Sequence, residues 1–134
     1  MTDTPGSKPL LDKLGVPPGG RVVVLGVDDP AFGRLLAERA VDVREGPPDE
    51  ATDVVFLGAD SVAELAPLRD LASAIRPNAA IWVVSRKGRA ATLRYDELLA
   101  VARDAGLVDN KVAAFSDTHT ALRFVIPRAL RPRR

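Results

Sequence analysis

The chain has 134 residues, of which 46% are hydrophobic and 28% charged, and this balance is typical of one globular domain. It contains no cysteine and one histidine, so disulfides, thiolate metal sites and two-histidine metal sites are excluded. No apolar run approaches the ~18 residues of a membrane span and the first residues are polar. We therefore expect no membrane segment and no signal peptide, and we expect a cytoplasmic protein.

Charge is distributed unevenly along the chain. The formal net charge is +1, and residues 128–134 contain four arginines, so removing those four charges leaves −3 on the rest. We interpret residues 128–134 as a solvated basic tail, with contact to nucleic acid or an acidic partner as the alternative. Residues 1–127 contain no basic stripe with interleaved aromatic residues, so nucleic-acid binding is not expected.

The first half of the chain predicts two strands and two helices. Residues 21–27 form an unbroken apolar run rich in valine, which is typical of a strand covered on both faces. Asp29 and Pro30 are a favourable cap and first residue for a helix, and apolar residues then recur at helical spacing. Further predictions are a flexible N-terminus at 1–9, a short helix or turn at 10–14 and a short strand at 41–44.

The second half predicts two further buried strands, two helices and a hairpin. Ser61 and Glu64 have the spacing of a capping box, and the helix that follows is interrupted or restarted at Pro67. Thr92 is the predicted cap of the next helix, which Gly106 ends. The predicted strands are residues 53–58 and 79–85, followed by a hairpin of residues 111–115 and 121–126.

Strands that alternate with helices predict an α/β fold: a three-layer sandwich with a mostly parallel sheet and right-handed crossovers. The hairpin adds an antiparallel edge, and the expected strand order, numbered along the chain, is 2-1-3-4-6-5. The link between the second and third strands has about eight residues, whereas a parallel crossover usually needs a dozen or more. Either the second strand is very short or its neighbour lies elsewhere. We expect residues 10–127 to form this single domain.

Residues 53–126 resemble the second half of a class I S-adenosylmethionine-dependent methyltransferase domain. The resemblance is carried by the acidic start of the strand at Asp53, by an apolar helix followed by the segment 75–84, and by the helix and turn at 98–107 before the closing hairpin. One helix-and-strand unit is missing after Val43. The resemblance therefore implies a truncated Rossmann-like, methyltransferase-like fold.

The segments 14–22 and 106–112, together with Trp82, also resemble an uncharacterised bacterial family of small truncated Rossmann-like domains, a domain of unknown function. This resemblance covers most of residues 10–128 and carries no assigned chemistry. Members of that family often have a tryptophan in the final hairpin loop, where this chain has His119. Trp82 lies in the most apolar strand, so we expect it to pack in the core.

The turn after the first strand lacks a known cofactor motif. Gly26 and Gly33 are separated by Asp28, Asp29, a proline and a phenylalanine, which matches neither the dinucleotide fingerprint nor a P-loop. Two carboxylates at a helix start repel a pyrophosphate, whereas a positive sulfonium is less disfavoured. We therefore expect no cofactor, with S-adenosylmethionine as the alternative.

Ligands of open α/β sheets bind beyond the carboxyl ends of the strands. The basic loop at 86–89 could bind an anion there or be a solvated turn. Ser116, Asp117 and His119 are too close along the chain to form a hydrolytic triad, and no catalytic or metal site is predicted. The candidate ligand-binding residues at this edge are Gly26, Asp28, Asp29, Asp60, Ser61, Arg86, Lys87 and His119.

These observations favour a non-catalytic binding or interaction domain that docks a ligand or partner at the carboxyl ends of the strands, with a small anion or a protein as the partner. The first alternative is a divergent S-adenosylmethionine-binding protein or methyltransferase. It predicts an open pocket above Gly26 and Val27, a space that Phe32 would otherwise occupy. The second alternative is a structural module that self-assembles, for example as a homodimer, through an edge strand or the hairpin.

Overall fold

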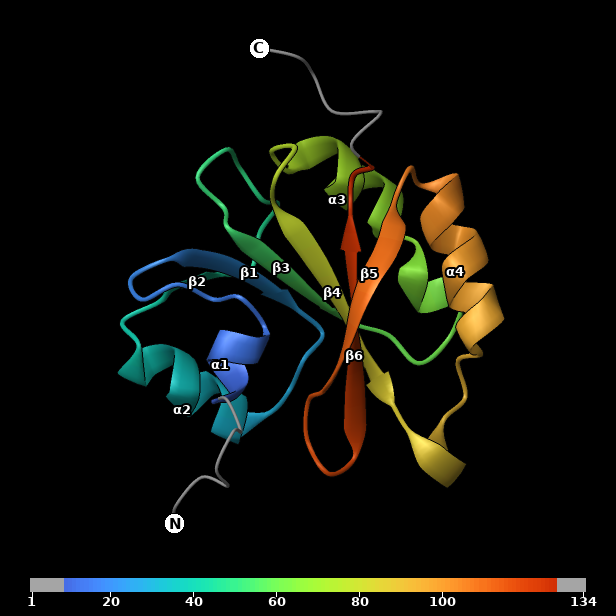
Figure 1. The fold of residues 1–134 in the computed structure, drawn as a ribbon, viewed down its shortest axis with the longest axis horizontal. Helices are drawn as coiled ribbons and strands as arrows, with labels where there is room; N and C mark the ends of the chain where they lie inside the picture. The colour runs from blue at the N-terminus through green and yellow to red at the C-terminus, as the bar shows by residue number, and fades with distance from the viewer. Residues whose placement is uncertain (1–8, 128–134) are drawn as a thin grey trace.

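The computed structural model describes residues 9–127, and the predicted basic tail and all of the predicted flexible N-terminus except Pro9 lie outside this range (Figure 1). No helix within it is long and apolar enough to cross a membrane. The elements in chain order are α1 (Leu10–Lys13), β1 (Arg21–Leu25), α2 (Pro30–Glu38), β2 (Asp42–Arg44), β3 (Val54–Gly58), the 3-10 turn η1 (Ala63–Leu65), α3 (Leu68–Ala74), β4 (Ala80–Arg86), the 3-10 turn η2 (Gly88–Ala90), α4 (Tyr95–Asp104), β5 (Val108–Ala114) and β6 (His119–Val125).

The strands form one six-stranded sheet in the order β2-β1-β3-β4-β6-β5, which is the predicted order. β1 pairs in parallel with β2 and β3, and β3 with β4, whereas β6 is antiparallel to β4 and β5. The short link between β2 and β3 is possible because β2 has only three residues, so the chain needs few residues to return to the start of β3. This link, residues 45–53, contains no helix.

Helices cover the sheet on both faces, so the fold is a three-layer α/β sandwich (Figure 1). One core lies under α1 and α2 and includes Phe32, Phe56 and Trp82, while the other lies under α3 and α4 and includes Leu68 and Phe124. Trp82 is fully buried, and its Nε1 donates a hydrogen bond of 2.9 Å to the Leu14 carbonyl. Trp82 is therefore a core residue, as predicted.

Three local predictions change in the structure. Thr92 does not cap α4, because its hydroxyl donates to the Asp60 carbonyl (2.6 Å) and the helix starts at Tyr95 without a side-chain cap. Ser61 Oγ accepts the Glu64 N–H (3.2 Å), but only the short 3-10 turn η1 follows, and its N-cap is Val62 without a side-chain cap. Pro67 is the N-cap of α3, so the helix restarts there, one of the two predicted outcomes. β5 begins at Val108, earlier than predicted, because an edge strand tolerates the polar residues that follow.

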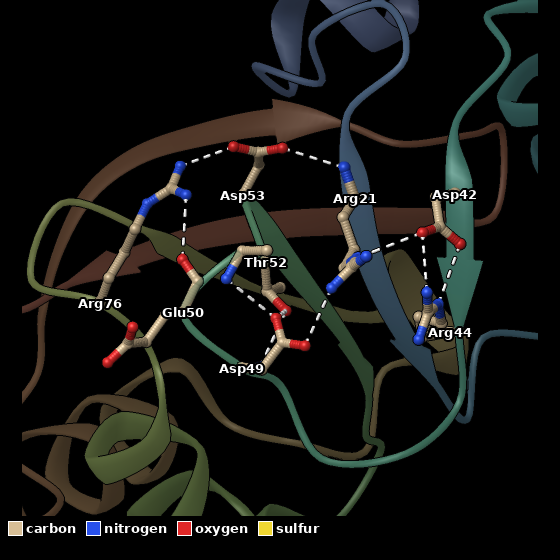
Figure 2. Close-up of polar contacts among 9 residues, drawn as sticks. Arg21, Asp42, Arg44, Asp49, Glu50, Thr52, Asp53 and Arg76 are labelled. Carbon is tan, nitrogen blue, oxygen red and sulfur yellow. Dashed lines mark hydrogen bonds and ion pairs between the residues drawn. The ribbon is translucent and has the colours of Figure 1, made fainter.

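A network of ion pairs joins the link 45–53 to the amino ends of the strands (Figure 2). The Arg21 guanidinium contacts Asp42 (3.1 Å) and Asp49 (2.9 Å). Asp53 accepts the backbone N–H of Arg21 (2.9 Å) and pairs with Arg76 (2.6 Å). These contacts attach the link 45–53 to the sheet. We call Arg21, Asp42, Arg44, Asp49, Asp53 and Arg76 the amino-edge network.

The three carboxylates of the amino-edge network all have pKa values below the usual range of an aspartate. The hydrogen bond from Arg44 is the main cause that lowers the pKa of Asp42, and Arg21 adds to it. Burial alone would raise the pKa of Asp49 and Asp53, but hydrogen bonds from backbone N–H groups and arginines outweigh it and hold both values low. The native fold therefore favours the ionised form of all three side chains.

Candidate functional site

A cavity of about 270 Å³ opens at the carboxyl ends of β1, β3 and β4, and we call it the carboxyl-edge cavity. Three segments surround it: the turn that joins β1 to α2, the end of β3 with the chain that follows, and the loop of the β5–β6 hairpin. It is lined by Gly26, Val27, Asp28, Asp29, Pro30, Gly58, Ala59, Asp60, Glu64, Val84, Phe115, Thr118 and His119.

Two glycines lie side by side at this cavity: Gly26, which directly follows β1, and Gly58, the last residue of β3. Gly26 has a φ of +73°, a conformation that favours glycine. A Cβ on Gly58 would overlap the Gly26 carbonyl oxygen and lie 2.8 Å from the carbonyl carbon, so the two backbones touch. The missing Cβ atoms leave room for this contact between the two backbones, and both glycines line the cavity with main-chain atoms alone. Gly58 was not predicted as a site residue, since its contact with Gly26 exists only once β1 and β3 pair.

Asp28 and Asp29 are adjacent but have different roles. Asp29 caps α2 as predicted, because its Oδ1 accepts the backbone N–H groups of Ala31 (3.0 Å) and Phe32 (3.2 Å). These N–H groups are the ones that a phosphate at this helix end would need. Asp28 is exposed and lies in the cavity wall. The turn is therefore unsuited to a phosphate but open to a positively charged group.

The other two carboxylates of the cavity belong to the chain that follows β3. Asp60 Oδ1 accepts the backbone N–H of Arg86 (2.8 Å), and Asp60 Oδ2 lies 3.7 Å from the Arg86 Nε. Glu64 Oε1 accepts the Asp60 N–H (2.8 Å). Four carboxylates thus line the cavity, and no lysine or arginine of residues 9–127 does.

His119 is the remaining titratable side chain of the cavity. Its Nδ1 lies 2.8 Å from the Thr118 hydroxyl, and its backbone N–H donates to Ser116 Oγ (3.2 Å). Asp117 is exposed, and neither Asp117 nor Ser116 contacts the imidazole ring within the described range. The three residues therefore form a hairpin turn and do not assemble a hydrolytic triad.

Five of the eight candidate residues line the cavity, and their ligand binding stays a prediction. The other three lie outside it: Ser61 Oγ accepts the Glu64 N–H (3.2 Å), Arg86 contacts Asp60, and the Lys87 N–H donates to the Thr118 carbonyl (3.1 Å). The basic loop is thus beside the hairpin and does not face the cavity. The candidates that line it are Gly26, Asp28, Asp29, Asp60 and His119.

Phe32 leaves the cavity open. It is buried beneath the turn, with its ring centroid 5.0 Å from that of Phe56 and 4.8 Å from that of Phe115. Phe115 forms part of the cavity wall and Phe32 does not. The open space above Gly26 and Val27 is the one that the methyltransferase alternative predicts.

A second hollow, of about 580 Å³, lies on the other side of the same turn. It shares residues 26–29 with the carboxyl-edge cavity and extends past Gly33 to Glu45, which follows β2. In dinucleotide-binding folds an acidic residue roughly 20 positions after the glycine turn binds ribose hydroxyls. Glu45 has this spacing from Gly26, so the spacing was a signal in the sequence that could have identified it.

Comparison with known proteins gives structural matches only. No family model matches the chain, and no curated protein matches its sequence, so membership of the uncharacterised bacterial family stays a prediction. A SAM-dependent methyltransferase from Aquifex aeolicus matches with a TM-score of 0.63 at 14% identity, over 88% of each chain. A TehB-like SAM-dependent methyltransferase from Corynebacterium glutamicum matches with a TM-score of 0.62 at 12% identity, over 88% of this chain and 85% of that one.

Larger methyltransferases match in part. The neocarzinostatin O-methyltransferase NcsB1, solved with S-adenosyl-L-homocysteine, matches with a TM-score of 0.57 at 15% identity, over 81% of this chain and 50% of that one. This chain spans about half the length of the first structures that it matches. At these identities the matches establish a class I methyltransferase-like fold.

Proposed function

We propose that this chain binds a sulfonium nucleoside of the S-adenosylmethionine type at the carboxyl edge of the sheet. The proposal is carried by the carboxyl-edge cavity, which is open to the backbone at Gly26 and Gly58 and lined by four carboxylates. Carboxylates attract a sulfonium and repel the phosphates of a nucleotide. The solved complex of NcsB1 with S-adenosylmethionine supports the same ligand class for a similar fold.

The residues present fit such a ligand. Gly26 and Gly58 line the cavity with main-chain atoms alone, and Asp28 offers a carboxylate for the positive charge. Glu45 offers a carboxylate for hydroxyl groups of a ribose. The two hollows meet at the turn of residues 26–29, which suits a ligand with a nucleoside part and an amino-acid part.

Calorimetric titration with S-adenosylmethionine, S-adenosylhomocysteine and ATP tests this proposal. We expect the sulfonium ligand to bind most tightly, its neutral thioether analogue several-fold more weakly and ATP not at all. Asp28→Asn should weaken S-adenosylmethionine binding, whereas Asp70→Asn, which removes an exposed carboxylate on α3, should leave it unchanged. No heat with S-adenosylmethionine, or tighter binding of ATP, would contradict the proposal.

A second candidate function, methyl transfer, is favoured by His119 in the cavity wall. Bound S-adenosylmethionine would supply an electrophilic methyl group, and the imidazole can accept the proton that a hydroxyl or amine acceptor loses. Incubation with a panel of small hydroxylated acceptors should then produce S-adenosylhomocysteine, detected by mass spectrometry. His119→Gln should abolish this product, while binding of S-adenosylmethionine remains detectable by calorimetry. If S-adenosylmethionine binds but no acceptor in the panel yields S-adenosylhomocysteine, methyl transfer is contradicted and the binding function stands.

A further inference from the structure

Positive charge gathers at the opposite end of the sheet, on the side of α1. Two adjoining hollows of about 400 and 180 Å³ lie there between the α1–β1 connection and the strands. Arg123 of β6 lines both of them, together with Asp12, Leu14 and Gly15. The cations that line one hollow or the other are Lys13, Arg39, Arg76, Lys111 and Arg123, and the carboxylates are Asp12 and Asp53.

Both carboxylates are already used by two of the arginines. Asp12 pairs with Arg39 at 2.8 Å, and Asp53 pairs with Arg76 at 2.6 Å. Arg39 also donates to the Val16 carbonyl at 2.8 Å. These pairs form the walls of the larger hollow and neutralise each other, so the uncompensated charge lies on the side of Arg123.

Arg123 and Lys111 are directly opposite each other in the β5–β6 pairing, so their side chains share a face of the sheet. Like charges at directly opposite positions destabilise a sheet. Arg123 Nη1 reaches only the Asn110 amide oxygen at 3.5 Å, and Lys111 Nζ donates to the Lys13 carbonyl at 3.1 Å. Neither side chain contacts a carboxylate in the described part of the chain.

We propose that Arg123 and Lys111 bind a phosphate group of a small ligand in these hollows. A guanidinium with free N–H groups forms paired hydrogen bonds to a phosphate, and the lysine adds a point charge from the facing position. A bound anion would also remove the repulsion between the two cations. The ligand is inferred to be small because Arg123 lines two hollows, whereas a polymer suits an extended basic surface.

Thermal unfolding with increasing pyrophosphate tests the proposal. Pyrophosphate should raise the Tm of the wild-type chain, and Arg123→Gln should weaken the apparent affinity at least tenfold. Lys111→Gln should weaken it several-fold. Arg89→Gln is the matched control, since it removes the same charge from the exposed turn η2 at the other end of the sheet and should keep the wild-type response. All variants retain the arginines of residues 128–134, so these cannot cause a difference.

Without pyrophosphate, both site variants should keep or raise the wild-type Tm, because each removes one of two facing like charges. If Arg123→Gln fails to fold, Lys111→Gln decides the question, since Lys111 is exposed. An unchanged Tm of the wild-type chain in pyrophosphate would overturn the proposal, as would an equal loss in Arg89→Gln. Binding of a single-stranded oligonucleotide that Arg123→Gln weakens, without any response to pyrophosphate, would also overturn it.

Discussion

Aspartates stand at both ends of the sheet, but they have different surroundings. At the amino edge, Asp42, Asp49 and Asp53 all contact arginines at 3.1 Å or less (Figure 2). At the carboxyl edge, the only ion pair of a cavity carboxylate within residues 9–127 is the 3.7 Å contact between Asp60 and Arg86. The amino edge uses its charges to attach the link 45–53, whereas the carboxyl edge keeps carboxylates beside an open cavity. Stability and ligand binding are therefore expected to respond to different substitutions.

The largest expected effect on stability comes from Gly58→Ala. The new Cβ would overlap the Gly26 carbonyl, so the ends of β1 and β3 would have to separate. Overpacking of this kind costs about 1–3 kcal/mol, and urea unfolding would measure it. The result would show how much the close contact between the ends of β1 and β3 stabilises the sheet. An unchanged free energy of unfolding would mean that the two strand ends can move apart at little cost.

Asp53→Asn tests the amino edge. The amide cannot pair with the Arg76 guanidinium as a carboxylate does, and the partly buried Arg21 N–H loses a charged acceptor. Hydrogen bonds to charged groups contribute about 1.5–3 kcal/mol, and partial exposure of this site reduces the expected loss to about 1–2 kcal/mol. Asp70→Asn on α3 is the control and should change the free energy of unfolding little. An equal effect of both variants would contradict a stabilising role for the network.

The same network gives the fold a predicted acid sensitivity. The folded-state pKa values of Asp42, Asp49 and Asp53 lie below the ordinary value of 3.8. Their contribution is therefore fully present above the unfolded-state pKa and is lost as the pH falls through the folded-state values. Tm measured between pH 7 and pH 2.5 should fall steeply below about pH 4. The fall should be shallower in Asp53→Asn, and an identical slope would contradict the assignment.

Asp29→Ala and Asp28→Ala test whether the two adjacent aspartates of the β1–α2 turn have different roles. Loss of an N-cap side chain costs about 1 kcal/mol, so the free energy of unfolding should fall by that amount. Asp28→Ala, one residue away, should change it by less than about 0.5 kcal/mol because Asp28 is exposed. Equal losses in the two variants would contradict the division of roles within the turn.

The smallest expected effect is an increase in the free energy of unfolding. Gly33 lies inside α2, and a Cβ there would meet no atom within 4 Å. Gly33→Ala should therefore stabilise the chain by about 0.5–1 kcal/mol in urea unfolding, the opposite sign to Gly58→Ala. A loss of stability would show that the free space around Gly33 is smaller than the structure indicates.

The sequence predicted most of the fold because its signals are local. Unbroken apolar runs identified the buried strands, and Asp29 with Pro30 marked the start of α2 correctly. β5 was harder to delimit, since its first residues include Asp109, Asn110 and Lys111 on an edge that does not require apolar side chains. Thr92 was misread because its hydroxyl has a distant acceptor, the Asp60 carbonyl, that only the folded chain provides.

The candidate site was predictable only where its residues follow strands directly. Gly26, Asp28 and Asp60 reach the cavity because the carboxyl ends of parallel strands meet at one edge. His119 reaches it from the amino end of the antiparallel strand β6. Gly58 lies within a predicted strand, and its role depends on contact with Gly26 across the sheet. The pairing of Arg123 with Lys111 likewise depends on the register of β5 and β6, which the bulge at residue 110 shifts.

The central claim is that S-adenosylmethionine binds at the carboxyl edge, whereas the amino-edge network stabilises the fold. The most direct measurement is the Tm of the wild-type chain, Asp28→Asn and Asp53→Asn, each with and without saturating S-adenosylmethionine. We predict that Asp28→Asn keeps the ligand-free Tm and loses most of the ligand-induced increase, while Asp53→Asn lowers the ligand-free Tm and keeps that increase. A full ligand-induced increase in Asp28→Asn, or its loss in Asp53→Asn, would contradict the claim.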